Sequence, residues 1–177
     1  MIAALAGRRI DAPASAPPRF PLANVPLVRA RLAERFAHDR PDTLVCSAAC
    51  GADLLALDVA GAMGVRRRIV LPFHPGQFRD TSVVDRPGDW GALFDRVINE
   101  VAGLGDLVVL DIDAATGDEA YRLTNRRVFD EVRALNDPAW MAVVVWDGEA
   151  CHGIDLSAEF LAEARRLKGR VEVIPTL

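Results

Sequence analysis

Hydrophobic positions along the chain fall into short continuous runs and into longer segments with helical spacing. The short runs predict six strands, at residues 2–6, 43–46, 68–73, 107–110, 140–146 and 171–174. Between them, apolar residues recur at helical spacing, which predicts helices over residues 24–38, 52–60, 89–101, 118–135 and 156–167. Strands and helices alternate from end to end without a repeat. The pattern therefore predicts an α/β fold, a single doubly wound, Rossmann-like parallel sheet of six strands with helices on both faces, as one domain over residues 1–177.

Two stretches lack such periodicity and are predicted as loops. Residues 12–23 are rich in proline and alanine, which predicts an extended loop. Residues 74–89 form a long irregular segment after the third strand, and a loop of this length at a strand's end is more often functional than accidental. Phe73 and Phe78 belong to this region. Either they stack on the base of a ligand, or they are apolar plugs that fix the loop.

The turn after the second strand is the first candidate for ligand binding. Ser47, Ala48 and Gly51 have almost no side chain there, so a ligand has room to approach the backbone. The N–H groups that begin the next helix point into the same space, which is how backbone alone holds a phosphate. The alternative is that small residues merely let the helix pack closely on the strand. Asp53 is a candidate helix cap.

Two further loops follow predicted strands, and ligands of open α/β sheets bind at such strand ends. Gly7 lets the chain turn, and Arg8 and Arg9 place guanidinium groups there, which suit phosphates or carboxylates. The alternative is a solvated arginine pair. Asp147 and Gly148 begin the other loop, over residues 147–157. The concentration of small, basic and amide-bearing residues in these loops predicts a site for an anionic small molecule.

Composition narrows the function classes. The formal net charge of −4 argues against a broad nucleic-acid surface, and Lys168 is the only lysine, which argues against a Schiff base. Cys46, Cys50 and Cys151 do not form a disulfide framework, and no Cys/His pair stands at zinc-ligand spacing, so we predict no metal site. There is no run long enough to span a membrane and no signal-peptide layout. We expect a soluble, cytoplasmic protein without membrane contact.

Several segments together resemble the SLOG superfamily, the Rossmann-like fold shared by the DNA-processing protein DprA and the Lonely Guy phosphoribohydrolases. They are Gly-Arg-Arg-Ile-Asp at 7–11, Cys-Gly-Ala-Asp at 50–53 within 47–58, Leu-Pro-Phe at 71–73 and the segment 144–153. Tyr121 with Asn125, and Trp90, also look like this superfamily. The most similar branch has Gly-His-Arg after its first strand, whereas this chain has Arg8 in place of that histidine.

The resemblance implies a nucleotide or nucleotide-derived ligand at the strand ends, and a role as a sensor. It implies that Gly7, Arg9, Ser47, Gly51 and Asp53 line the ligand site. Lonely Guy enzymes carry a Pro-Gly-Gly-x-Gly-Thr-x-x-Glu loop after the late strand and an Arg-Lys-x-x-Met helix start. Residues 146–153 and 125–129 differ from both motifs, so phosphoribohydrolase activity does not carry over.

We therefore predict a module that binds a small nucleotide-type ligand, with no other cofactor. The expected ligand-binding residues are Gly7, Arg8, Arg9, Ser47, Ala48, Gly51, Asp53, Phe73, Phe78, Tyr121, Asn125, Asp147 and Gly148. One alternative is a hydrolase that cleaves an N-glycosidic or phosphate bond, with its carboxylate drawn from Asp53, Asp58 and Asp147. Another is a structural or interaction domain whose crevice is filled by its own side chains. A homodimer stays open.

Overall fold

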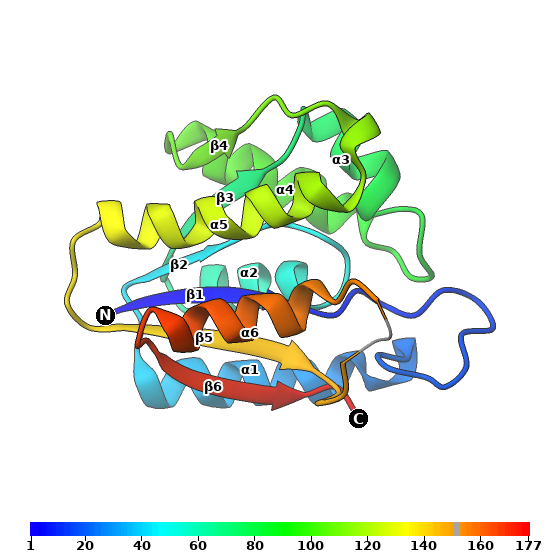
Figure 1. Ribbon diagram of the computed structural model, residues 1–177, viewed down its shortest axis with the longest axis horizontal. Coiled ribbons are helices and arrows are strands. Elements are labelled where there is room, and N and C mark those ends of the chain that lie inside the picture. The colour runs from blue at the N-terminus through cyan, green and yellow to red at the C-terminus, as the bar shows by residue number, and fades with distance from the viewer. Residues whose placement is uncertain (151–152) are drawn as a thin grey trace.

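Six parallel strands form one sheet in the order β4-β3-β2-β1-β5-β6 (Figure 1). The computed structural model of the chain describes residues 1–150 and 153–177. The strands are β1 (Ile2–Gly7), β2 (Thr43–Cys46), β3 (Arg66–Leu71), β4 (Leu107–Val109), β5 (Trp140–Trp146) and β6 (Arg170–Pro175). Each neighbouring pair is parallel. The α/β fold with a six-stranded parallel, Rossmann-like sheet is thus confirmed.

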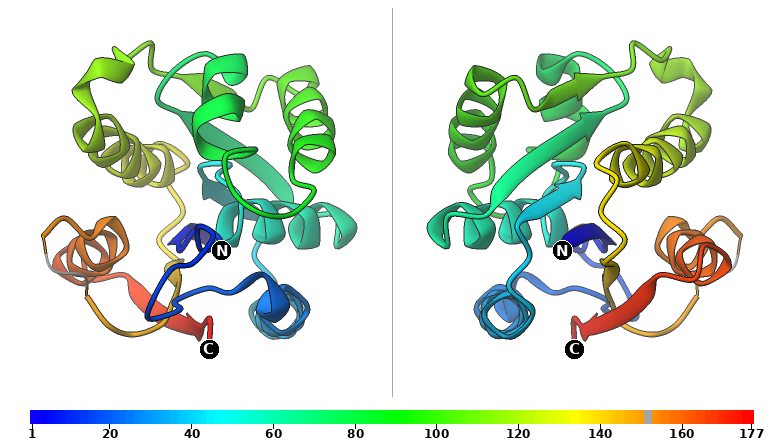
Figure 2. Two further views of the ribbon diagram at one scale, coloured as in Figure 1. Left: turned by 90° about the vertical axis from the view of Figure 1, so that its right-hand side faces the viewer. Right: turned by 90° about the vertical axis from the view of Figure 1, so that its left-hand side faces the viewer.

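Helices cover both faces of the sheet (Figure 2). One face carries α1 (Val25–Asp39), α2 (Ala52–Ala62) and α4 (Gly91–Gly103), and the other carries α5 (Asp118–Ala134) and α6 (Leu156–Arg166). The short helices are α3 (Pro75–Ser82), η1 (Leu22–Asn24) and η2 (Ala114–Thr116). No helix in the described ranges is long and apolar enough to cross a membrane.

Burial explains why these segments take these conformations. Residues 141–146 of β5 are all buried, as expected of a central parallel strand with a helix layer on each side. In α1 the buried residues Val28, Leu32 and Phe36 are spaced four apart and form one apolar stripe. Helix α2 is buried over most of its length, because it is packed between α1 and α4 as well as on the sheet.

The prediction of an irregular segment at 74–89 is wrong for its first half, where α3 forms. His74 occupies the N-cap position, and its Nδ1 accepts a hydrogen bond from the Gly76 N–H at 3.2 Å. Pro75 follows in the first turn, where a proline costs no hydrogen bond. The His-Pro-Gly sequence therefore starts a helix here, although proline and glycine together are typical of turns.

The helix predicted over 24–38 forms as α1, and the residue before it makes a contact other than a helix cap. Asn24 stands at the N-cap position, but its side chain makes no capping hydrogen bond. Its Nδ2 instead donates to the carbonyl oxygen of Thr176 at 2.9 Å and joins this loop to the end of β6. The loop predicted over 12–23 contains a turn, where the Ser15 N–H donates to the Ala12 oxygen at 3.1 Å, and it ends in η1.

Arginines in the amino-terminal half of β3 form ion pairs with two buried carboxylates. Arg66 binds Asp106 through two nitrogens, at 2.8 and 2.7 Å, and Arg68 contacts both Asp106, at 3.0 Å, and Glu131. Glu131 also accepts from Arg127 Nε at 2.6 Å. Both carboxylates are buried, so each one depends on its arginines for compensation.

The connectivity determines where loops gather. From β1 the chain builds outward to β4, then crosses over to place β5 on the other side of β1. In open sheets the crevice at such a reversal, at the carboxyl ends of the strands, is the usual place for a ligand. The loops that follow β1, β2 and β5 meet at this end of the molecule.

Candidate functional site

A cavity of about 200 Å³ lies at the carboxyl ends of β1 and β2. The first turns of α5 and α6 cover it, and α3 contributes one wall. We call it the strand-end cavity; it is lined by Ala6, Gly7, Arg9, Ser47, Ala49, Asp53, Phe78, Asp118, Tyr121, Thr124, Asn125, Leu156 and Ser157.

The cavity brings together residues from the three regions that the sequence singled out. Its lining includes the predicted ligand-binding residues Gly7, Arg9, Ser47, Asp53, Phe78, Tyr121 and Asn125. It does not include the other predicted ones, which are Arg8, Ala48, Gly51, Phe73, Asp147 and Gly148. The geometry thus divides the predicted set between one cavity and its surroundings.

Two polar atoms of the cavity lining have no hydrogen-bond partner. They are Ser47 Oγ and Arg9 Nε, and both are buried within the described part of the chain. The other end of the Arg9 guanidinium pairs with Asp85. A buried polar atom without a partner costs free energy, so native structures contain few of them, and each one calls for an explanation such as a ligand or an ordered water.

Asp53 is the buried carboxyl group of the cavity. It lies in the first turn of α2 with 7% of its surface exposed, and its Oδ2 accepts from the Ala49 N–H at 3.2 Å. That N–H precedes the helix, so the side chain braces the turn and does not cap α2. Burial raises the pKa of Asp53 to about 7, while the Ala49 N–H and the charge of Arg9 act in the opposite direction. The group therefore titrates near neutral pH.

Gly51 makes close contact with residues 8–10, directly after β1. Its φ is +97°, and a Cβ there would lie 2.8 Å from the Arg8 carbonyl oxygen and 2.9 Å from the Ile10 nitrogen. The Ala52 N–H donates to the same Arg8 oxygen at 3.1 Å. Ala48, next to this turn, is completely buried. Close packing of the turn on residues 8–10 thus accounts for glycine at 51 without a ligand.

Arg8 and Asp147 belong to an ion-pair cluster between the ends of β1 and β5. Arg8 Nε lies 3.1 Å from Asp147 Oδ1, and its Nη2 lies 2.7 Å from Asp155 Oδ2. Arg19 Nε binds the other oxygen of Asp147 at 2.6 Å. The two aspartate side chains are only 6% and 4% exposed. The crevice at the strand reversal is therefore occupied by ion-paired side chains of the chain itself, as the structural-domain alternative expects, while the strand-end cavity beside it is open.

The same cluster anchors α6 and the loop after β5. Asp155 is the N-cap of α6, and its Oδ1 accepts from the N–H groups of Ser157 and Ala158 at 3.1 and 3.0 Å. Gly148 is exposed and has a φ of +87°. Cys151 and its neighbour His152 lie outside the described residues.

The aromatic residues that follow β3, Phe73 and Phe78, pack on each other and on neighbouring aromatic rings. The ring of Phe73 lies 6.0 Å from Phe78 and 6.1 Å from Tyr121, and Phe78 stacks on Phe94 at 6.1 Å. Phe73 and Phe78 are 4% and 1% exposed. Both side chains thus act as the apolar plugs of one alternative, and only Phe78 reaches the cavity wall.

Asp58, Cys46 and Cys50 do not belong to the cavity lining. Asp58 joins three helices, because it accepts from Arg29 on α1 and from Arg96 Nη2 on α4, the latter at 2.7 Å. Burial raises the pKa of the Cys46 and Cys50 thiols, as for buried structural cysteines. Among the described residues, no three metal-ligating side chains converge.

The sequence did not predict three polar residues of the cavity lining. Asp118 stands at the mouth, on the first turn of α5, and Thr124 and Ser157 are buried. The spacing of Tyr121, Thr124 and Asn125 places them on one face of a helix, so this spacing could have indicated Thr124. The position of Ser157 depends on how α6 docks, which no local pattern reveals.

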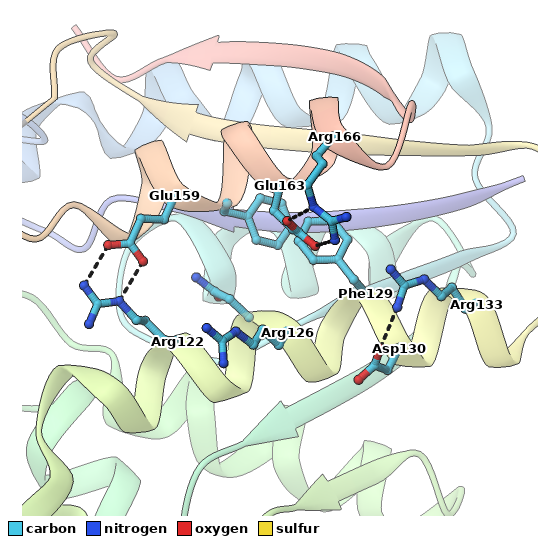
Figure 3. A pocket seen from close by; sticks show the side chains of 10 residues that line it. Arg122, Arg126, Phe129, Asp130, Arg133, Glu159, Glu163 and Arg166 are labelled. Atoms are coloured by element: carbon cyan, nitrogen blue, oxygen red, sulfur yellow. Dashed lines mark hydrogen bonds and ion pairs between the residues drawn. The ribbon is translucent and has the colours of Figure 1, made fainter.

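A second hollow, of about 520 Å³, runs between α5 and α6 (Figure 3). Most of its charged residues pair with one another: Arg122 binds Glu159 through two nitrogens, at 2.8 and 2.9 Å, and Arg166 binds Glu163. The stacked rings of Phe129 and Phe160 close its floor. This groove lies along the helices and not at the strand ends, and we assign the candidate site to the strand-end cavity.

Comparison with models of known protein families gives no match, and comparison with curated proteins gives no significant relative. The family relationship suggested by the sequence motifs thus stays a prediction.

Proposed function

We propose that the chain binds a nucleotide or a nucleotide-derived small molecule in the strand-end cavity, as a sensor-type module. The observation that carries this proposal is the pair of buried, unpartnered polar atoms, Ser47 Oγ and Arg9 Nε, at the ends of adjacent parallel strands. The resemblance to the SLOG superfamily supports it, because Gly7, Arg9, Ser47 and Asp53 of the resembling motifs line this cavity.

A thermal-shift experiment with AMP, ADP-ribose and NAD tests the proposal. A ligand present at about 100 times its Kd should stabilise the folded chain by about 2.7 kcal/mol. The absence of any shift across this panel and the common nucleoside phosphates would refute the proposal.

A serine variant links binding to the cavity. Ser47→Ala removes the unpartnered hydroxyl, so the free protein should keep its melting temperature or gain slightly, while the ligand-induced shift should fall. Ser15→Ala, in the exposed part of the loop between β1 and η1, serves as the control. It should leave the melting temperature and the ligand-induced shift unchanged. An unchanged ligand shift in Ser47→Ala would exclude this hydroxyl from the site.

A hydrolase is the second candidate, and Asp53 favours it. A buried carboxyl whose pKa is about 7 suits a general acid at neutral pH, and Asp53 faces the cavity. Asp58 and Asp147, the other predicted candidates, are held by arginines outside the cavity lining. Chromatographic detection of free base or phosphate released from nucleotides, abolished in Asp53→Asn, would favour the hydrolase over the sensor.

The proposal also includes a cytoplasmic location, because three cysteines without a disulfide framework suit a reducing compartment. A homodimer stays a prediction, which size-exclusion chromatography with light scattering would test.

A further inference from the structure

The strand-end cavity has little of the chemistry that holds a phosphate. Among the described residues that line it, Arg9 is the one cation, and its guanidinium is already paired with Asp85. Asp53 and Asp118 add two carboxyl groups to the same lining. A phosphate carries two negative charges near neutral pH and is normally met by several guanidinium or ammonium groups, or by free backbone N–H groups.

Several backbone donors around the cavity are already used. The Cys50 N–H donates to the Ser82 oxygen at 3.0 Å, and the Ala52 N–H donates to the Arg8 oxygen at 3.1 Å. The first N–H groups of α6 donate to Asp155, as described above. The amino-terminal end of α6 therefore offers a phosphate much less than an uncapped helix would, and in α2 the first N–H group, that of Ala52, is already bonded to Arg8.

The remaining polar side chains of the cavity lining suit the hydroxyl groups of a ligand. Ser47 Oγ is buried without a partner, the Asp53 carboxyl accepts the Ala49 N–H through Oδ2, and Asn125 of α5 also lines the cavity. A sugar hydroxyl both donates and accepts, so it satisfies a serine and a carboxyl group together. In other Rossmann-type sites an acidic side chain binds ribose hydroxyls in this manner.

The volume of the cavity also favours a single ring over a whole nucleotide. Pockets that enclose a whole small-molecule ligand are about 300 Å³ or larger, whereas this cavity measures about 200 Å³. It has room for one ring of a nucleotide but not for the whole molecule. The rest of the ligand would lie outside, toward the mouth at Asp118.

We propose that the strand-end cavity takes the ribose of the ligand, with the ribose hydroxyls on Ser47 and Asp53 and the 5′ substituent outside. This inference rests on the proposed function and names the part of the ligand that is recognised. Its consequence is that a nucleoside and its monophosphate bind with similar affinity, so the phosphate contributes little.

Calorimetry on the full chain near pH 7 tests this inference. The probes are the four ribonucleosides, their 5′-monophosphates and the 2′,3′-dideoxynucleosides. For the base that binds, we expect similar Kd values for nucleoside and monophosphate, and at least about tenfold weaker binding of the dideoxynucleoside, because the groups in the cavity lose their partners.

The variant Asp53→Asn keeps the size of the side chain and removes its charge. It should weaken nucleoside binding by about tenfold and shrink the difference between the ribonucleoside and its dideoxy form. Asp95→Asn, on the surface of α4, is the matched control and should bind as the wild type does.

The outcomes separate the inference from the proposed function. Monophosphates that bind more than about tenfold tighter than nucleosides, or dideoxynucleosides that bind as well as ribonucleosides, would overturn the ribose assignment and leave nucleotide binding intact. If none of these probes binds and the nucleotide panel above gives no shift, both proposals fail together.

Discussion

Replacing Asp53 by asparagine should change how the stability of the fold depends on pH. The carboxyl has a pKa of about 7 in the folded chain and an ordinary value of 3.8 in the unfolded chain. Between these two values the folded state keeps a proton that the unfolded state has released. The free energy of unfolding of the wild type therefore falls as pH rises through this window, and it levels off above about pH 7.

The size of the effect follows from the difference in pKa. Each pKa unit corresponds to about 1.4 kcal/mol, and the two values differ by about three units, so ionisation of Asp53 costs about 4 kcal/mol. The asparagine does not titrate, and its side-chain oxygen still accepts the Ala49 N–H. Asp53→Asn should thus match the wild type near pH 4 and exceed it by about 4 kcal/mol near pH 8.

Urea denaturation followed by circular dichroism, at several pH values between about 4 and 8, measures this difference. Subtracting the two profiles removes the contribution of the other titrating groups. Parallel profiles for wild type and variant would refute the reasoning, because they would mean that Asp53 ionises normally in the folded chain.

Asp58→Asn is the matched control on the same helix. Burial alone would raise the pKa of Asp58, but hydrogen bonds from Arg96 and Arg29 outweigh it and hold the pKa below its ordinary value. The stability that these contacts provide is present above pH 4 and is lost only as pH falls below it. The control should therefore show a constant deficit of about 1 kcal/mol between about pH 5 and 8, without a slope.

Three further substitutions test the packing and the ion pairs, each by urea denaturation near pH 7. Gly51→Ala should lower the free energy of unfolding by about 3 kcal/mol, because its Cβ meets backbone atoms at a positive φ. Gly64→Ala, with open space around it, should lower it by about 1 kcal/mol. Equal losses would contradict the contact described for Gly51. Arg8→Ala removes a partner from two buried carboxylates and should cost about 3 kcal/mol, against less than about 1 kcal/mol for the exposed ion pair of Arg133. Glu131→Ala removes a buried carboxylate that binds two arginines and should cost about 3 kcal/mol, so a loss below about 1 kcal/mol would show that these pairs add little.

The fold could be predicted because its central strands, β1, β2 and β5, are mostly buried on both faces. Residues 140–146 are all apolar, and the length and β-branched content of this run favour a strand over a helix. Helix α3 shows the limit of this reasoning. It begins within a His-Pro-Gly sequence that is also compatible with a turn, and the packing of Phe78 on the aromatic cluster adds to the His74 cap in favouring a helix.

The candidate site could be predicted only as far as topology dictates it. Residues directly after parallel strands must meet at one edge of the sheet, which is why Arg9, Ser47 and Asp53 line one cavity. Whether a charged side chain faces that cavity or another part of the chain depends on partners far away in sequence. Arg8 pairs with Asp155, 147 residues later, and no local pattern distinguishes it from Arg9.

The place of β5 in the sheet has a consequence for synthesis of the chain. β1 precedes the other five strands in the sequence and lies in the middle of the sheet, yet its neighbour on one side, β5, comes about 140 residues later. Until β5 emerges from the ribosome, the apolar β1 is an edge strand with unpaired backbone groups, a state that favours association with other chains. Fragments that stop before residue 140 should therefore aggregate, and a holdase chaperone should bind the nascent chain longest over β1.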